Sequence, residues 1–213
     1  SSIPEGFARQ KTIRCGDPLE ISGHCVVYAN ELLDAQPFQS WVFTDGTWKR
    51  TGVQVQADAY HVGLLPEPMQ TLRPPACFPA STREGYRIDW PSGASTILQA
   101  ILAQPWQGML ILCDYGKDWQ DLLHDYPEGT ARAYYKHKQH NDLLQHPGEQ
   151  DITHHICWSE LEAILENQNF REIRTQRQES YLIHHASEEI ENLMQKEKSH
   201  SLGPLKELLH PGY

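Results

Sequence analysis

Polar and acidic side chains follow an apolar run near the start of the chain. Residues 25–29 are uncharged β-formers; Asn30 and Glu31 come directly after them, and Asp34 lies three residues beyond Glu31. Such a run predicts a strand buried on both faces of a parallel sheet. The carboxyl ends of these strands form the mouth of the ligand crevice in an open α/β sheet. We therefore expect Asn30, Glu31 and Asp34 to lie at the position where the chemistry of such a fold takes place.

A purely structural role explains the same three residues. Asn30 would be the N-cap of a helix, and Glu31 would be favoured by the positive end of the helix dipole. Asp34 would then form an ion pair within the first turns of that helix. The residue types alone leave both interpretations open.

A second apolar run ends in the same way. Residues 109–113 lead directly into Asp114 and Tyr115, with Gly116 after them. The functional interpretation places Asp114 and Tyr115 along the substrate side of the crevice. The structural alternative is that Asp114 caps the turn at Gly116.

The residues before this second run predict the elements that position both strand ends. Apolar residues recur at helical spacing between Ala94 and Leu102, which predicts an amphipathic helix. Pro105 and Gly108 then interrupt the chain before the strand. A helix followed by an apolar strand is half of a βαβ unit, so we expect residues 25–29 and 109–113 to be adjacent parallel strands.

The segment from 37 to 92 interrupts this α/β pattern and is predicted to be an insertion. Asp45-Gly46 between two apolar runs predicts a β-hairpin. Val53 and Val55 alternate with polar residues and indicate a further strand. Residues 64–92 are rich in proline and lack periodicity, which predicts an ordered loop region.

The C-terminal third carries signals for two helices and two strands. Ser159 and Glu162 have the spacing of a capping box, with Ser159 as N-cap. The β-like runs at 170–175 and 181–185 predict an antiparallel pair at a sheet edge. A charged helix is expected from Ser187 to about residue 198.

The composition excludes several classes of protein. The formal net charge is −10 over 213 residues, so binding to nucleic acid by a basic surface is not expected. No apolar stretch approaches the length of a membrane span. The five cysteines are odd in number and widely spaced, which is typical of free thiols in a reducing compartment.

Five short motifs follow one another along the chain. They are Asn-Glu-Leu-Leu-Asp-Ala at 30–35, Asp-Tyr-Gly at 114–116, Gly-Thr at 129–130, Tyr-Lys-His at 135–137 and His-Pro-Gly-Glu-Gln-Asp-Ile-Thr at 146–153. In this order they resemble the MidA-like family of S-adenosylmethionine-dependent methyltransferases, which includes the mitochondrial factor that methylates an arginine of a respiratory complex I subunit. The resemblance extends from about Arg9 to Leu209.

The resemblance implies a fold and a division into domains. The fold is α/β, with a Rossmann-like class I methyltransferase sheet, an inserted β-hairpin and loop region, and a closing antiparallel strand pair. Residues 1–36 together with 93–213 would form the methyltransferase part, and 37–92 the insertion. The compartment implied is the cytoplasm in a bacterium or the mitochondrial matrix in a eukaryote.

The resemblance also implies S-adenosyl-L-methionine as cofactor and a protein arginine as methyl acceptor. Each expected site residue then has a role. Glu31 and Asp34 would be catalytic, Asn30 would lie by the methionine portion of the cofactor, and the substrate side would be lined by Asp114, Tyr115, His137 and Asp151. For Asp151 the capping of a turn, and for His137 the ordering of a loop, stay open as structural alternatives.

One feature departs from the family pattern. Such enzymes bind the cofactor with a glycine-rich loop after their first strand, but no two of the 14 glycines here are separated by a single residue. The chain also begins at Ser1 without an initiator methionine. We expect the first two or three βα units to be missing from this chain. Another chain or a second copy would then lie along the exposed flank, or the chain would be a non-catalytic binding or assembly module.

The 12 histidines suggest a further alternative, a metal-dependent hydrolase. His137 and His140 are three residues apart, and His154 and His155 follow Asp151 closely. Zinc sites use such residues at short spacing. So many histidines make chance neighbours common, however, and no cysteine lies at ligand spacing, so no metal site is predicted.

Overall fold

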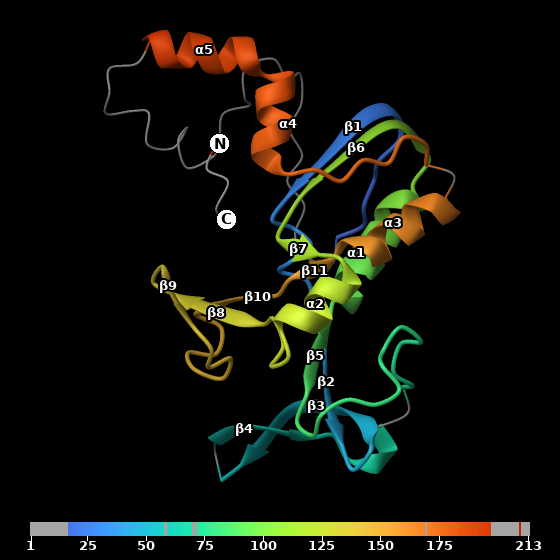
Figure 1. Ribbon diagram of the computed structural model, residues 1–213, viewed down its shortest axis with the longest axis vertical. Helices are drawn as coiled ribbons and strands as arrows, with labels where there is room; N and C mark the ends of the chain where they lie inside the picture. Colours follow the sequence, from blue (N-terminus) through green and yellow to red (C-terminus); the bar gives the residue numbers. More distant parts are fainter. Residues whose placement is uncertain (1–16, 58, 70–71, 169, 197–208, 210–213) are drawn as a thin grey trace.

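The computed structural model describes residues 17–57, 59–69, 72–168, 170–196 and 209. Two parallel strands end where the sequence predicted the site. Strand β1 (Gly23–Asn30) pairs with β6 (Trp106–Cys113), and Val26 lies opposite Met109 (Figure 1). The predicted parallel pair is therefore confirmed. Because the strands run in one direction, their carboxyl ends meet at the same edge.

The helices beside these strands cover one of their faces. Helix α1 (Ser92–Leu102) buries Ala94, Leu98 and Ile101, so the predicted amphipathic helix is confirmed. A core cluster joins α1, the loop after β1 and α3 (Trp158–Asn167) to partly buried leucines of β6. The members of this cluster are Leu33, Ala94, Leu98, Ile156, Leu161 and Leu165, with Leu110 and Leu112 packed against them.

The expectation that β1 is buried on both faces is wrong within the described residues. Val26, Tyr28 and Met109 share the opposite face of the pair, and each is more than half exposed. Apolar side chains such as these are usually buried, but among the described residues no element packs on that side.

A four-stranded antiparallel sheet lies within residues 37–92. Its order is β4 (Ala59–Leu64), β3 (Thr47–Gln56), β2 (Gln39–Thr44) and β5 (Arg87–Trp90), with a short 3₁₀ turn at Glu67–Met69. The predicted hairpin at Asp45-Gly46 is confirmed, and both residues have the positive φ of a type I′ turn. Val53 and Val55 belong to the long strand β3 rather than to a separate strand. The expected loop at 64–92 contains β5, which the sequence analysis missed.

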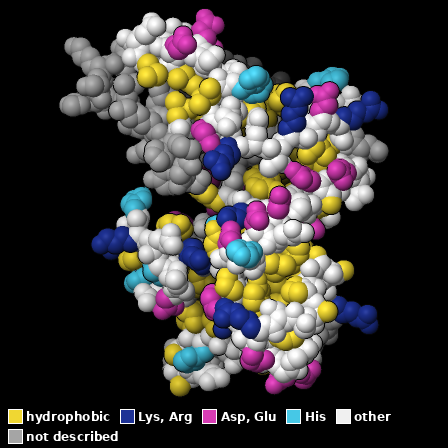
Figure 2. All heavy atoms as spheres, in the orientation of Figure 1, with side chains coloured by type: hydrophobic (Ala, Val, Ile, Leu, Met, Phe, Trp, Pro, Cys, Tyr) yellow, Lys and Arg dark blue, Asp and Glu magenta, His cyan; other side chains and the backbone are white. Residues whose placement is uncertain are grey.

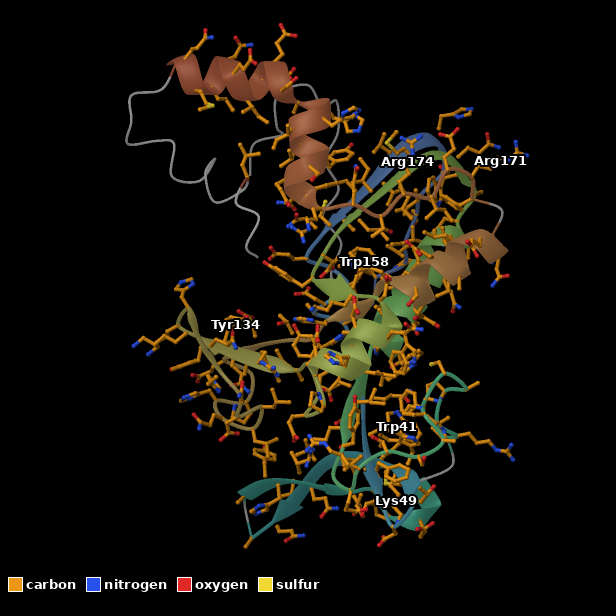
Figure 3. The ribbon with its side chains drawn as sticks, viewed as in Figure 1. Trp41, Lys49, Tyr134, Trp158, Arg171 and Arg174 are labelled. Carbon is orange, nitrogen blue, oxygen red and sulfur yellow. The ribbon has the colours of Figure 1, made fainter. Side chains whose placement is uncertain are left out.

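Aromatic side chains cover one face of this sheet. Trp41 of β2, labelled in Figure 3, contacts Phe78 edge to face. Phe78 in turn stacks on Trp119 of helix α2 (Trp119–Asp125). Aromatic pairs at such separations contribute beyond the area that they bury. The sheet is thus held against the helical part of the chain through its aromatic face.

Asp89 of β5 forms a second connection from this sheet. Its Oδ2 accepts the backbone N–H groups of Thr130 and Ala131, each at 2.9 Å. The Thr130 hydroxyl accepts the backbone N–H of His155 at 3.2 Å. Gly129, beside this carboxylate, has a φ of +84°, and an added Cβ would lie 2.3 Å from Asp89 Oδ2.

Short strands complete the structure beyond β6. They are β7 (Gly116–Lys117), which pairs in parallel with β11 (Ile156–Cys157), and the antiparallel sheet of β10 (Asp151–Thr153), β8 (Arg132–Tyr135) and β9 (Lys138–His140). In Figure 1 this antiparallel sheet projects to the side of the β1–β6 pair. The arrangement is a mixed α/β fold, as expected.

The predicted capping box at Ser159 is wrong. Helix α3 begins two residues earlier than this prediction, with Cys157 as its N-cap, and no side chain caps it. The Ser159 hydroxyl instead accepts the backbone N–H of Trp119 at 3.0 Å. Tertiary contact between α2 and α3 therefore overrides the local capping signal.

The predicted antiparallel pair at 170–175 and 181–185 is also wrong. Residues 170–177 form no strand, and Phe170 packs on Trp106. Helix α4 (Gln178–His185) occupies the second segment. A short apolar run does not distinguish strand from helix, and local bonds such as Tyr181 N–H to the Arg177 carbonyl decide for the helix.

Helix α5 (Ser187–Lys196) begins at the predicted residue, and the expected continuation to 198 lies outside the described residues. In Figure 2 hydrophobic side chains gather over the region of α4 and α5 at the top of the molecule. Among the described residues, no helix has the length and apolar character needed to cross a membrane.

Candidate functional site

The loop after β1 turns sharply at Glu31. This residue has a φ of +48°, and its backbone N–H donates to the carbonyl of Cys113 at 2.9 Å. No helix follows, so the interpretation of Asn30 and Glu31 as a helix start is wrong. The bond joins the end of β1 to the end of β6, and a non-glycine residue in this conformation is uncommon and typical of functional sites.

Asp114 organises this loop from the neighbouring strand. Its Oδ2 accepts the backbone N–H of Leu33 at 2.8 Å and that of Asp34 at 3.3 Å. Its Oδ1 accepts the N–H of Tyr115 at 2.9 Å. Burial raises the pKa of Asp114, while these backbone donors oppose the rise. The carboxylate thus caps the loop after β1 rather than only the turn at Gly116.

Tyr115 directs its hydroxyl at Glu31. The phenol donates to Glu31 Oε1 at 3.2 Å. Burial and the neighbouring carboxylate of Glu31 raise the pKa of Tyr115 to about 12, so the phenol stays protonated and remains a donor at neutral pH. The Glu31 side chain is open to solvent and is therefore the carboxylate that an incoming ligand can reach.

Asp34 lies beneath this exposed carboxylate. It is only 3% exposed, and its Oδ1 has no hydrogen-bond partner among the described residues. Burial, followed by the charges of Asp114 and Glu31, raises the pKa of Asp34 to about 6. No described cation forms an ion pair with Asp34, so the local salt bridge considered above does not form within this part of the chain.

His154 is buried next to Asp34 and was not predicted as a site residue. Its backbone N–H donates to the Asp34 carbonyl at 3.0 Å, and its ring Nε2 lies 2.9 Å from the Gln36 carbonyl. The side chain is 2% exposed, and its proximity lowers the pKa of Asp34. Its position directly after the 146–153 motif is the one signal that could have indicated it.

Asp151 and His137 occupy different parts of the small antiparallel sheet. Asp151 is exposed and lies opposite Tyr134 in the β10–β8 register. Tyr134, labelled in Figure 3, is near enough to Tyr115 to contribute to the raised pKa of that phenol. Sequence reasoning missed Tyr134, which connects Asp151 to the border of the site. His137 lies in the exposed turn between β8 and β9 with a φ of +63°, and no contact among the described residues joins it to the carboxylates.

Asn30 lies at the end of β1, on the same uncovered face as Val26 and Tyr28. Its Oδ1 accepts the Tyr28 hydroxyl at 3.2 Å, and the residue is exposed. A ligand over this face of the β1–β6 pair would reach both Asn30 and Glu31.

The arrangement suits a cationic ligand. Three carboxylates meet at the joined strand ends: Glu31 is exposed, Asp114 accepts backbone N–H groups, and Asp34 is buried. Within the described ranges, no three His, Cys, Asp or Glu side chains are arranged to hold a metal ion. The His154 ring that the metal hypothesis would use lies against the carbonyls of Gln36 and His155.

A family model matches residues 12–175, and its description is "Putative S-adenosyl-L-methionine-dependent methyltransferase". The chain belongs to this methyltransferase family. S-adenosyl-L-methionine is therefore the cofactor of its family, as the motifs indicated. No curated protein matches the chain significantly by sequence.

Two solved structures from Burkholderia thailandensis share the fold of this methyltransferase family member. An uncharacterized COG1565 superfamily protein superposes with a TM-score of 0.74 at 23% identity, covering 90% of this chain and 51% of that one. A COG1565 member titled a "likely methyl transferase", bound to S-adenosyl-homocysteine, gives a TM-score of 0.72 at 22% identity, covering 91% and 51%. The chain thus spans about half the length of these two proteins.

The residues at the strand ends fit part of this cofactor. S-adenosyl-L-methionine carries a cationic sulfonium and an ammonium group, and the exposed Glu31 and Asn30 offer a carboxylate and an amide beside the uncovered face. A glycine-rich loop that would approach the ligand with its backbone does not occur in the sequence, because no two glycines are separated by one residue.

Proposed function

We propose that this chain carries the acceptor-binding part of a protein-arginine methyltransferase. The observation that supports the proposal is the exposed Glu31 carboxylate, held by Tyr115 at the point where β1 and β6 end together. Asp114 fixes the loop that presents it, and Asp34 adds a second negative charge beneath it. A guanidinium is the side-chain cation whose forked donors match such a carboxylate best.

Each residue has a distinct part in this proposal. S-adenosyl-L-methionine, when bound, would supply the methyl group for the acceptor nitrogen. Glu31 holds the guanidinium and orients its nitrogen. Asp34 is a positioning residue, since it is buried, and Asn30 faces the methionine portion of the cofactor.

The wider substrate surface is proposed to extend over Asp114, Tyr115 and Asp151, with His137 contacting only the more distant part of a protein substrate. The family resemblance favours a respiratory complex I subunit as that substrate. It favours the bacterial cytoplasm or the mitochondrial matrix as the compartment.

We infer that the glycine-rich loop is supplied from outside this sequence, by a preceding segment or by another chain. Two observations support this inference. The Burkholderia structures are about twice as long as the chain, and the face formed by Val26, Tyr28 and Met109 is uncovered among the described residues.

Binding of peptides tests the acceptor part on this chain alone. An arginine peptide should bind, and the same peptide with citrulline, a neutral analogue of similar shape, should bind at least ten-fold more weakly. Glu31→Gln should abolish the difference between the two peptides, whereas Glu149→Gln, a change at another exposed acid, should not. Equal binding of the arginine and citrulline peptides would contradict the proposal.

A non-catalytic binding or assembly module is the second candidate. The absence of a GxG sequence favours it. Transfer of labelled methyl groups by the protein expressed over its whole reading frame separates the two: transfer to arginine supports the enzyme, and retained peptide binding without transfer supports the module.

A further inference from the structure

The hairpin of β8 and β9 is positively charged and lies close to the acidic site. Residues 132–140 contain Arg132, Lys136 and Lys138 and no aspartate or glutamate, in a chain whose formal net charge is −10. Both lysines are exposed. Figure 2 shows Lys or Arg side chains on this projecting part of the molecule. We call residues 132–140 the basic hairpin.

The cations of the basic hairpin have no acidic partner among the described residues. None of the ion pairs in this part of the chain includes a residue of the hairpin, whereas Lys49 and Lys117 each pair with an aspartate. Asp142, the first acid after the hairpin, instead accepts the backbone N–H of Leu144 and the side-chain amide of Gln145. The positive charges of the hairpin are therefore free to bind a ligand.

The tip of the basic hairpin is a two-residue turn in an uncommon conformation. Tyr135 pairs with Lys138, so the turn consists of Lys136 and His137, whose φ angles are +49° and +63°. Asn and Gly are the residues that such a turn favours, and strained positions of this kind cluster at functional sites. Lys136 Nζ lies 4.9 Å from the centroid of the Tyr135 ring, which stacks on His146 at 3.9 Å. The turn thus presents its cation on a stacked aromatic support.

Tyr134 connects the basic hairpin to the candidate site. It is close enough to Tyr115 to contribute to the raised pKa of that phenol, and the Tyr115 hydroxyl binds Glu31. Lys136 follows Tyr134 by two residues, and successive residues of a strand advance only about 3.3 Å. An extended peptide with its arginine at Glu31 therefore reaches the tip of the hairpin within a few residues.

We propose that the basic hairpin binds an acidic segment that lies a few residues from the acceptor arginine in the protein substrate. This inference rests on the proposed function and names the class of substrate, an arginine flanked by Asp or Glu. Glu31 takes the guanidinium, and Lys136 and Lys138 take the carboxylates of the flank. Opposite charges at two separate points select against a segment that is basic throughout.

The charge of the chain favours an acidic protein segment over nucleic acid. A net charge of −10 repels anions in general, and the basic hairpin reverses this repulsion locally. Nucleic acid carries phosphates along its whole length and is bound through many cations at once. A short acidic flank needs only the two lysines at the tip, and its arginine is attracted by the neighbouring carboxylates.

Three arginine peptides that differ only in their flanks test the proposal on this chain. One has Glu, one Gln and one Lys on both sides of the arginine. The Glu-flanked peptide should bind about three- to ten-fold more tightly than the Gln-flanked one, as two exposed charge pairs allow, and the Lys-flanked peptide should bind most weakly. The preference should shrink as salt is raised.

Charge reversal at the tip should invert the preference. Lys136→Glu/Lys138→Glu should bind the Lys-flanked peptide most tightly, and since both side chains are exposed, circular dichroism should show an unchanged fold. The matched control is Arg171→Glu/Arg174→Glu, which makes the same change in net charge at two exposed arginines away from Tyr134 (Figure 3). It should keep the preference for the Glu-flanked peptide.

The outcomes separate this inference from the proposed function. Tighter binding of arginine than of citrulline peptides, with equal affinity for all three flanks, would overturn the inference and leave the proposed function standing. Equal binding of arginine and citrulline peptides would contradict the proposed function, and the inference with it. Loss of the preference in Arg171→Glu/Arg174→Glu would assign it to net charge and overturn the inference. So would displacement of the Glu-flanked peptide by a lower concentration of a single-stranded oligonucleotide.

Discussion

The hydroxyl of Tyr115 donates a hydrogen bond to the carboxylate of Glu31, a residue 84 positions earlier in the sequence. The bond connects the residues that follow two parallel strands and fixes the exposed carboxylate of Glu31. Its geometry is possible because the Glu31 N–H is already bound to the Cys113 carbonyl, which holds the two strand ends together.

Glu31→Gln is expected to lower methyl transfer by about ten- to a hundred-fold in the protein expressed over its whole reading frame. A charge-assisted bond to guanidinium is worth roughly 1.5–3 kcal/mol, and its loss translates into such a rate change if it strengthens in the transition state. Transfer of labelled methyl to the substrate protein measures the effect, with cofactor affinity followed in parallel. Tyr115→Phe keeps the charge and should cost less; wild-type turnover by Glu31→Gln would leave the site unassigned.

Asp34→Asn is expected to stabilise the chain at neutral pH. Burial and neighbouring charges raise the pKa of Asp34 from 3.8 to about 6, so the folded state binds this proton more tightly than the unfolded state. The contribution to the free energy of unfolding is greatest below pH 4 and is lost as the pH rises to about 6. Near pH 7 the variant should gain on the order of 2–3 kcal/mol over the wild type, and near pH 4 the two should coincide.

His155→Asn should reveal the opposite slope. Burial, followed by the charges of Arg132 and Lys117, lowers the pKa of His155 from 6.5 to about 4. The unfolded state therefore binds this proton more tightly, and stability increases as the pH rises from 4 to 6.5. Urea unfolding at pH 4.5 and pH 7 measures both variants: Asp34→Asn should lose more stability on acidification than the wild type, and His155→Asn less. Parallel pH profiles for all three proteins would refute the burial argument.

Gly108→Ala is expected to disrupt the β1–β6 pair. Gly108 has a φ of +139°, and an added Cβ would lie 2.0 Å from the Cys25 carbonyl oxygen. Backbone cannot retreat as a flexible side chain can, so the cost should exceed about 3 kcal/mol. Gly148→Ala is the control, since it also has a positive φ but nothing within 4 Å of the added Cβ. Similar unfolding free energies for the two variants would contradict this expectation.

The chain alone is expected to bind S-adenosyl-L-methionine weakly. The reason is the absence of a glycine-rich loop from its sequence. Isothermal calorimetry with the isolated chain checks this. Micromolar affinity, about −8 kcal/mol, would show that the strand ends suffice for cofactor binding.

Local sequence patterns correctly predicted those strands, helices and turns whose residues show a clear periodicity or a specific turn sequence. The two apolar strands, the helix predicted between Ala94 and Leu102, and the Asp45-Gly46 turn each combine residue type with a clear period or turn requirement. The closing strand pair failed because the run around Leu182 is too short to show a period, and local helical bonds decided it. The capping box failed because Ser159 makes a contact with a residue 40 positions away.

The sequence predicted which residues lie at the candidate site, but only part of how they are arranged. Glu31, Asp34, Asp114 and Tyr115 follow strand ends and do meet. That Asp34 is buried while Glu31 is exposed depends on the left-handed turn at Glu31, which residue types did not indicate. Tyr134 reaches the site through the β8–β10 pairing, which has no signal along the sequence. His154 reaches it through a loop hydrogen bond to the Asp34 carbonyl, and only its position after the 146–153 motif could have indicated it.

The Asp89 carboxylate has a consequence for how this protein can be engineered. It binds the 130–131 backbone, and Thr130 binds the backbone of His155, next to the buried His154. If this sheet were exchanged for that of a relative, the new sheet would need an acid at the position of Asp89. Without it, the backbone of residues 130–131 would lose the hydrogen bonds that hold it, and with it the support for His155. A chimaera in which residues 37–92 come from a relative should fold stably only when residues 129–131 come from the same relative.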